Sequence, residues 1–230
     1  MQHRSAYLRV RNNSEDCQIA VDKTQQMIEL LGNLRREMNG AVADSMYYSG
    51  KRYGLNYGVS IPTIRSIARN VQPDMSLAKY LLTQQVRELQ LAALHIVPVE
   101  ELTADDAIAI EEHVTNSELA EEASFALFGR CSCFNELSER WMESGNEQLM
   151  YCALLSAARN PIADRITIAT KLPAIITANT SNIVARGAIS LLTAIANSSD
   201  KEAVGDLLNA LPDTSASDKI REEVAWMLEY

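Results

Sequence analysis

The sequence predicts an all-α protein in which antiparallel helix pairs stack into an α-solenoid. Apolar residues recur at helical spacing along almost all of the 230 residues, which favours helices over strands. Similar helices return at a regular interval, and short connections of about 2–6 residues separate them. Only 9 Gly and 6 Pro are present, which counts against a loop-rich all-β fold.

Five segments align without gaps, and their starts lie 30, 30, 35 and 36 residues apart. Each begins with a large apolar residue and carries a small or β-branched residue four positions later, on the same helix face. The period indicates a degenerate HEAT-like array in a superhelical stack. A non-repetitive bundle of Ala-rich helices is the alternative. The segments start at Leu89, Leu119, Leu149, Val184 and Ile220.

One further helix is expected between each pair of these segments, at about 103–114, 134–143, 163–177 and 199–210. Thr103 to Asp106 and Ser117 with Glu118 open helices, and Ser199 to Glu202 matches a capping box. Pro161 suits the first turn of another helix. With no clear boundary, residues 1–230 form one predicted domain, and residues 1–15 form a possible flexible N-terminal arm.

Composition narrows the class of protein. No apolar run is long enough for a membrane span, and the four cysteines are too few for a disulfide scaffold, so a reducing cytoplasm is expected. The three histidines are scattered, and neither a metal nor a cofactor is expected. Trp141 and Trp226 are expected in the core.

The net charge of −9 is unevenly distributed. Residues 1–90 carry 12 Lys and Arg against 8 Asp and Glu, a net of +4. Residues 91–230 carry 9 against 22, a net of −13. A polyanion would therefore dock on the N-terminal part, unless the acidic residues simply crowd solvent-facing surfaces.

The segment 49–62 is the most unusual, with three Gly, two Tyr and a Lys-Arg pair. Ser60 is a natural N-cap and Pro62 suits the first turn of the helix that follows. That helix end can hold a phosphate, although a purely structural entry loop explains the same residues. The nearby Tyr47 and Tyr48 either pack on the N-terminal helices or contact bases.

Residues 58–68, GVSIPTIRSIA, and 87–94, RELQLAAL, resemble the HEAT-like DNA alkylation repair family of the AlkD type. The resemblance extends over roughly residues 25–230 in helix order and spacing. It implies an α-solenoid that holds duplex DNA in a basic concave groove. It also implies a glycosylase for N3- or N7-alkylpurines, in which an Asp carboxylate stabilises the developing oxocarbenium charge, beside Trp and Arg.

The residues that the resemblance places at this site are replaced. The catalytic Asp aligns with Ala123, the Arg with Tyr151, and the two Trp positions with Leu119 and Ser190. A shift of one or two residues brings Glu122 or Glu121 to the Asp position. Glu121, Glu122 and Tyr151 are therefore the remaining catalytic candidates, and a non-catalytic protein is favoured.

The predicted function is DNA binding through a concave helical-repeat surface with a degenerate glycosylase site. An active glycosylase with a rebuilt site and a non-enzymatic scaffold for a protein partner are the alternatives. The predicted DNA contacts are Lys51, Arg52, Thr63, Arg65, Arg87, Arg159 and Arg186.

Overall fold

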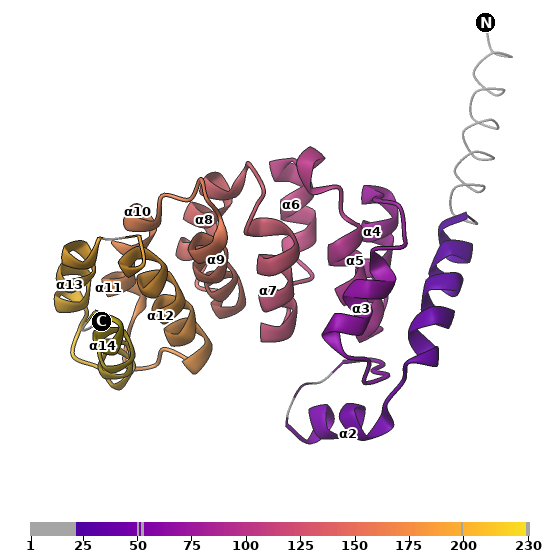
Figure 1. Cartoon of the computed structure of the whole chain (residues 1–230), viewed down its shortest axis with the longest axis horizontal. Coiled ribbons are helices and arrows are strands. Elements are labelled where there is room, and N and C mark those ends of the chain that lie inside the picture. Colours follow the sequence, from indigo (N-terminus) through magenta and orange to yellow (C-terminus); the bar gives the residue numbers. More distant parts are fainter. Residues whose placement is uncertain (1–21, 50, 52, 199, 229–230) are drawn as a thin grey trace, which may run out of the picture. The chain divides into compact units, whose positions relative to one another are not determined.

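A computed structural model describes residues 22–49, 51, 53–198 and 200–228. Within these ranges the chain is helical, without a β-strand (Figure 1). One isolated parallel bridge joins Leu55 to Val86. The helices form two compact units, Met1–Ile96 and Val97–Tyr230, and each is described by itself. The predicted arm at 1–15 lies outside the described residues.

The first unit contains a helix at 22–36 and four labelled helices. α5 packs against both α3 and α4, and its Leu89, Leu91 and Leu94 are fully buried. Ser60 caps α3, with Pro62 in the first turn, which confirms both predictions. The labelled helices are α2 (Gly40–Tyr48), α3 (Ile61–Ala68), α4 (Met75–Leu82) and α5 (Arg87–Ile96).

The second unit arranges its helices in two rows (Figure 1). The first row has α7 (Ser117–Ala123), α9 (Glu147–Arg159), α12 (Asn182–Ala196) and α14 (Ser215–Leu228). The second row has α6 (Ala104–Glu111), α8 (Phe134–Glu143), α10 (Arg165–Ala169), α11 (Leu172–Ile175) and α13 (Lys201–Ala210). Two short elements are η1 (Val99–Glu101) and η2 (Ser124–Phe128), a π-helical continuation of α7.

Neighbours within a row pack on each other, α7 on α9, α9 on α12 and α12 on α14. The rows meet through α8 on α9, α10 on α12 and α13 on α14. This alternation of stacked helix pairs is the repeat that the sequence predicted. The small residues expected at the helix contacts, Ala123, Ala153 and Ala188, are fully buried.

The helix starts were predicted with mixed success. Thr103 and Asp106 form a complete capping box at α6, and α7 begins at Ser117, as expected. Asp200 is the N-cap of α13 and accepts the amide of Ala203, so the capping box predicted one residue earlier is wrong. Ser199 itself lies outside the described residues. Pro161 lies in a turn before α10 rather than in its first turn.

The two tryptophans differ. Trp141 is fully buried and packs edge-on against Phe128, with ring centroids 4.7 Å apart. Its indole N–H donates to the carboxylate of Glu111, which joins α8 to α6. Trp226 is 65% exposed on α14, so the prediction that it lies in the core is wrong.

Candidate nucleic-acid interface

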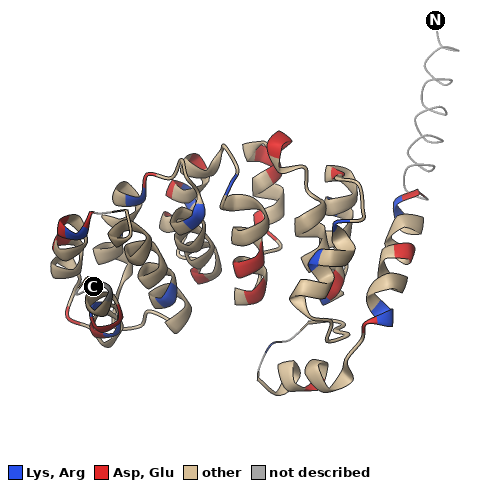
Figure 2. Cartoon of the chain, in the orientation of Figure 1, with Lys and Arg blue, Asp and Glu red and all other residues tan. Residues whose placement is uncertain are grey.

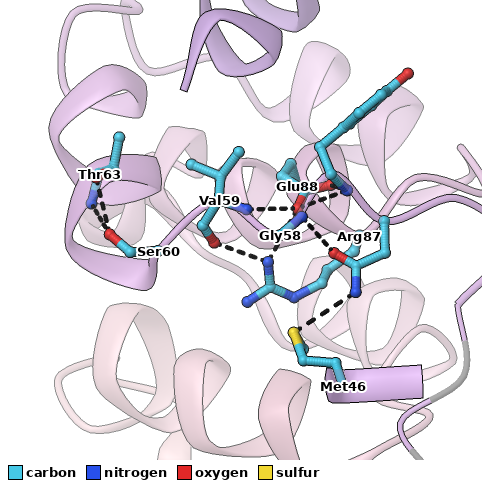
Figure 3. A network of polar contacts seen from close by, with 9 residues as sticks. Met46, Gly58, Val59, Ser60, Thr63, Arg87 and Glu88 are labelled. Atoms are coloured by element: carbon cyan, nitrogen blue, oxygen red, sulfur yellow. Dashed lines mark hydrogen bonds and ion pairs between the residues drawn. The ribbon is translucent and has the colours of Figure 1, made fainter. Parts of the chain in front are cut away.

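A buried ion pair holds the unusual loop of the first unit (Figure 3). The Glu88 carboxylate, on the first turn of α5, accepts the backbone amides of Tyr57 at 3.1 Å and Val59 at 3.3 Å. Arg87 donates to the Val59 carbonyl at 2.9 Å and to Glu88 at 3.0 Å. Both side chains are buried. Each charge compensates the other, and together the two side chains fix the loop on α5.

Arg87 was predicted as a DNA contact, and its burial corrects that prediction. Only 3% of the residue is exposed, and its guanidinium binds the loop carbonyl and Glu88 rather than facing solvent. A phosphate would have to displace a buried charge-assisted contact to reach it. We therefore assign Arg87 to the support of the loop.

Gly58 lets the loop pack closely against the first turn of α2. Its φ of +70° lies in the left-handed region that favours glycine. A Cβ here would lie 2.1 Å from the Asn39 carbonyl oxygen and 2.7 Å from the Ala43 amide. The Asn39 amide in turn donates to the Tyr57 carbonyl at 2.8 Å. The glycine is therefore required for the close approach of two backbones.

The other N-terminal candidates surround this loop and the start of α3. Thr63 donates its amide to the Ser60 hydroxyl at 3.3 Å, and the two hydroxyls lie 2.8 Å apart, so both complete the cap of α3. Lys51 is exposed, and Arg65 is half-buried on the last turn of α3. Arg52 lies outside the described residues. A phosphate site at this helix end stays a prediction.

Three of the predicted site residues meet in the second unit. The Tyr151 hydroxyl, on α9, donates to Glu121 Oε1 on α7 at 2.8 Å. Arg186 Nη2, on α12, lies 3.5 Å from the same oxygen. The Arg186 guanidinium also lies 5.8 Å from the centre of the Tyr151 ring, within range of a cation–π contact. Glu121, Tyr151 and Arg186 thus form one cluster across three neighbouring helices.

The environment of Tyr151 keeps it neutral. Burial raises the pKa of its phenol, and the hydrogen bond to Glu121 raises that pKa further, because a phenolate beside a carboxylate is repelled. Arg186 and Arg159 act in the opposite direction. Tyr151 therefore serves as a hydrogen-bond donor to Glu121.

Arg159 lies at the other end of α9. It is exposed, and its Nη1 donates to the Ser124 hydroxyl at 3.1 Å and to the Leu155 carbonyl at 3.0 Å. Ser124 begins the π-helical turn after α7, and the neighbouring Phe125 is 45% exposed. Figure 2 shows acidic positions on α7 and basic positions on α9 and α12, so this row carries charges of both signs.

The positions that the resemblance assigned to the catalytic residues hold no comparable groups. Ala123 and Leu119 are buried in the packing of α7, and the Ser190 hydroxyl donates to the Arg186 carbonyl within α12. Glu122 is also buried, with 4% exposed, so the structure does not present it as an accessible catalytic group. Glu121 is the carboxylate that lies with Tyr151 and Arg186.

The sequence did not single out Glu88 or Ser124 as site residues. Glu88 was visible only as part of the RELQLAAL pattern, where its side chain was not assigned a role. Ser124 gave no signal, because a serine in an Ala-rich helix is common. Both act through contacts more than 25 residues away in sequence.

The described residues contain no group of three or more His, Cys, Asp or Glu that could hold a metal ion. The Cys131 and Cys133 sulfurs lie 3.8 Å apart. Burial raises the pKa of Cys131 to about 12, and the neighbouring Cys133 adds to this rise. A thiol held protonated in this way is a poor metal ligand and a poor nucleophile.

This fold of stacked helix pairs, with an anchored loop and a charged cluster, is of the HEAT-like repeat class. The family described as DNA alkylation repair enzyme matches residues 30–182, and the chain belongs to this family. No curated protein matches the chain.

A solved structure with a similar fold is described as "A new family of proteins related to the HEAT-like repeat DNA glycosylases with affinity for branched DNA structures". The two share 12% identity with a TM-score of 0.68. The match covers 86% of this chain and 93% of that chain. At this identity the likeness establishes the HEAT-like fold and nothing further.

Proposed function

We propose that this protein binds DNA through its helical-repeat surface and does not perform the glycosylase reaction of the alkylation repair enzymes. Membership of the family over residues 30–182 carries the proposal of DNA binding. The affinity for branched DNA described for the similar structure supports including branched as well as duplex DNA. A single domain and a cytoplasmic location stay predictions; no helix of the described segments is long and apolar enough to cross a membrane.

The cluster on the second unit supports the non-catalytic part of the proposal. Family chemistry needs a carboxylate that stabilises positive charge as the base leaves, and loss of one such group costs about 10²–10³ in rate. Ala123 supplies no charge there. Glu121 already accepts a hydrogen bond from the Tyr151 hydroxyl and lies beside the Arg186 cation. These two contacts neutralise the negative charge that would have to stabilise a cationic sugar.

Arg159 and Arg186 are the proposed phosphate contacts in the second unit. Both are exposed on the first row, and arginine binds phosphate oxygens readily. Their present partners are a hydroxyl, a carbonyl and an exposed carboxylate. Exposed pairs contribute about 0–1 kcal/mol, so a phosphate can replace these partners at small cost. In the first unit, Lys51, Thr63 and Arg65 remain proposed contacts.

The test is equilibrium binding of the full chain to labelled duplex DNA and a four-way junction, by fluorescence anisotropy across a range of salt. We expect saturable binding that weakens with salt. Arg159→Gln and Arg186→Gln should each reduce the slope of log K against log salt by about 1. Lys201→Gln, which removes one exposed charge from the second row, is the matched control and should leave the slope unchanged. Absence of binding to either DNA at low salt would refute the proposal.

A glycosylase with a rebuilt site is the second candidate, favoured by the Glu121 carboxylate, whose side chain is 43% exposed on α7 two residues before Ala123. It requires release of 7-methylguanine or 3-methyladenine from methylated DNA, measured by chromatography. It also requires that Glu121→Gln abolish this release. Equal release by the wild type and Glu121→Gln would exclude Glu121 as its catalytic group.

A further inference from the structure

α2 is an apolar helix that buries none of its residues. Tyr48 is 85% exposed, Tyr47 is 54% exposed and Val42 is 40% exposed. The two tyrosine rings lie edge to face with centroids 5.8 Å apart. This exposure corrects the expectation that Tyr47 and Tyr48 pack on the N-terminal helices. Aromatic side chains on a soluble protein normally bury most of their surface, so this helix has a role outside the core.

The helix is nevertheless firmly attached to the first unit. Its N-cap Asn39 bonds to Tyr57, and Gly58 brings the loop backbone against the first turn of α2. Near the other end, the Asn56 amide donates to the Met46 sulfur at 3.5 Å, as Figure 3 shows. Glu88 then fixes the same loop to α5. These contacts hold α2, and with it the two exposed tyrosines, on the first unit.

The charge around α2 distinguishes the classes of partner. Residues 35–57 carry four Lys and Arg against two Asp and Glu, in a chain whose net charge is −9. Lys51 follows the tyrosines and is exposed, with its amide bonded to the Met46 carbonyl. Exposed aromatic rings beside cations suit single-stranded nucleic acid, because bases stack on the rings while phosphates meet the cations. This net positive charge favours an acidic partner over a second copy of the same segment.

We propose that α2 is a stacking element, in which Tyr48 and Tyr47 stack on base faces left exposed at a branch point of DNA and Lys51 meets the adjoining phosphate. The proposal rests on the DNA binding proposed above and adds the chemical feature that is recognised. In a continuous duplex the base faces are covered by their neighbours. At a junction or single-stranded flap they are accessible, so α2 would favour branched over plain duplex DNA.

The experiment uses the full chain, a four-way junction and a duplex, each with 2-aminopurine at the centre. Wild type should change the 2-aminopurine fluorescence of the junction on binding, because the base stacks on a ring. Tyr48→Ala should lose this change and bind the junction about 5- to 150-fold more weakly, the loss expected for one stacked base. Its affinity for the duplex should stay within about twofold, since no stacked base is lost there.

Two variants serve as controls. Tyr48→Phe keeps the ring and should behave as wild type. Val42→Ala removes another exposed side chain of the same helix and should change neither affinity. All these side chains are substantially exposed, so folding, checked by circular dichroism, should be unaffected.

The outcomes separate this inference from the proposed function. If wild type binds both DNAs and Tyr48→Ala binds them as wild type does, the stacking role is refuted and DNA binding stands. Equal weakening on both DNAs also refutes it. If wild type binds no DNA, the proposed function and the stacking role both fail. Sedimentation that shows a wild-type dimer dispersed by Tyr48→Ala would instead assign α2 to self-association and overturn the proposal.

Discussion

Replacing Gly58 by alanine tests the attachment of the loop to α2 most sharply, because Gly145 provides a matched comparison. The two glycines have nearly the same conformation, with φ of +70° and +68°. A Cβ on Gly145 would meet nothing within 4 Å. A Cβ on Gly58 would lie 2.1 Å from the Asn39 carbonyl oxygen. Any difference between the two alanine variants therefore reports the close backbone contact.

The expected magnitudes follow from this geometry. The left-handed conformation costs an alanine about 1–2 kcal/mol, and Gly145→Ala should lose about that much. Gly58→Ala also has to move the Asn39 backbone by about 1 Å to restore ordinary contact distances, and this breaks the hydrogen bond from Asn39 to Tyr57. With about 1 kcal/mol for that bond and a further contribution for overpacking of about 1–3 kcal/mol, the loss should reach about 3–6 kcal/mol.

Urea unfolding followed by circular dichroism at 222 nm measures both free energies. Native-state hydrogen exchange of the Asn39 and Ala43 amides reports the same contact locally. We expect Gly58→Ala to lose at least about 2 kcal/mol more than Gly145→Ala, since the contact and the hydrogen bond add to the same conformational cost. Equal losses by the two variants would refute the account of how α2 is mounted.

Three further changes are expected to have measurable effects. Glu88→Gln removes the charge that compensates a buried arginine and leaves an amide facing backbone N–H donors. The free energy of unfolding should therefore fall by about 3 kcal/mol. A fall of less than about 0.5 kcal/mol, the range of surface substitutions, would contradict this. Gly187→Ala places a Cβ 3.0 Å from Leu154 at the contact of α9 with α12 and should lower the melting temperature. An unchanged melting temperature would mean that the two helices are not closely packed at this point. The pKa of Asp164 is lowered by hydrogen bonds from Thr167. Its contribution to the free energy of unfolding is therefore present above the unfolded-state pKa and is lost as the pH falls through the folded-state pKa. Asp164→Asn should make this free energy depend less on pH below about pH 4, and an unchanged pH profile would contradict the assignment.

The order of helices could be predicted from the sequence because it depends on local periodicity. The repeated segments at Leu89, Leu119, Leu149, Val184 and Ile220 all begin within or beside first-row helices or α5. Helix starts were less predictable where two adjacent residues are both favoured N-caps, as at Ser199 and Asp200, since serine and aspartate are preferred at that position alike. Pro161 is compatible with a turn as well as with a first helical turn.

The roles of individual charged residues were harder to predict. From the sequence, Arg87 is indistinguishable from an exposed cation. Its burial depends on contacts with Glu88 and with the Val59 carbonyl, which is 28 residues away in the sequence. Trp226 was expected in the core because tryptophan buries a large apolar surface, but it is 65% exposed on α14. The meeting of Glu121, Tyr151 and Arg186 could not be derived from spacing, because it depends on how three helices pack.

The central claim is that this family member binds DNA without excising alkylated bases. The most direct measurement incubates the full chain with a methylated, labelled duplex and junction, and records binding and the release of 7-methylguanine from the same samples. The account predicts saturable, salt-dependent binding with release no greater than in buffer. Release that requires Glu121, or absence of binding at low salt, would contradict it.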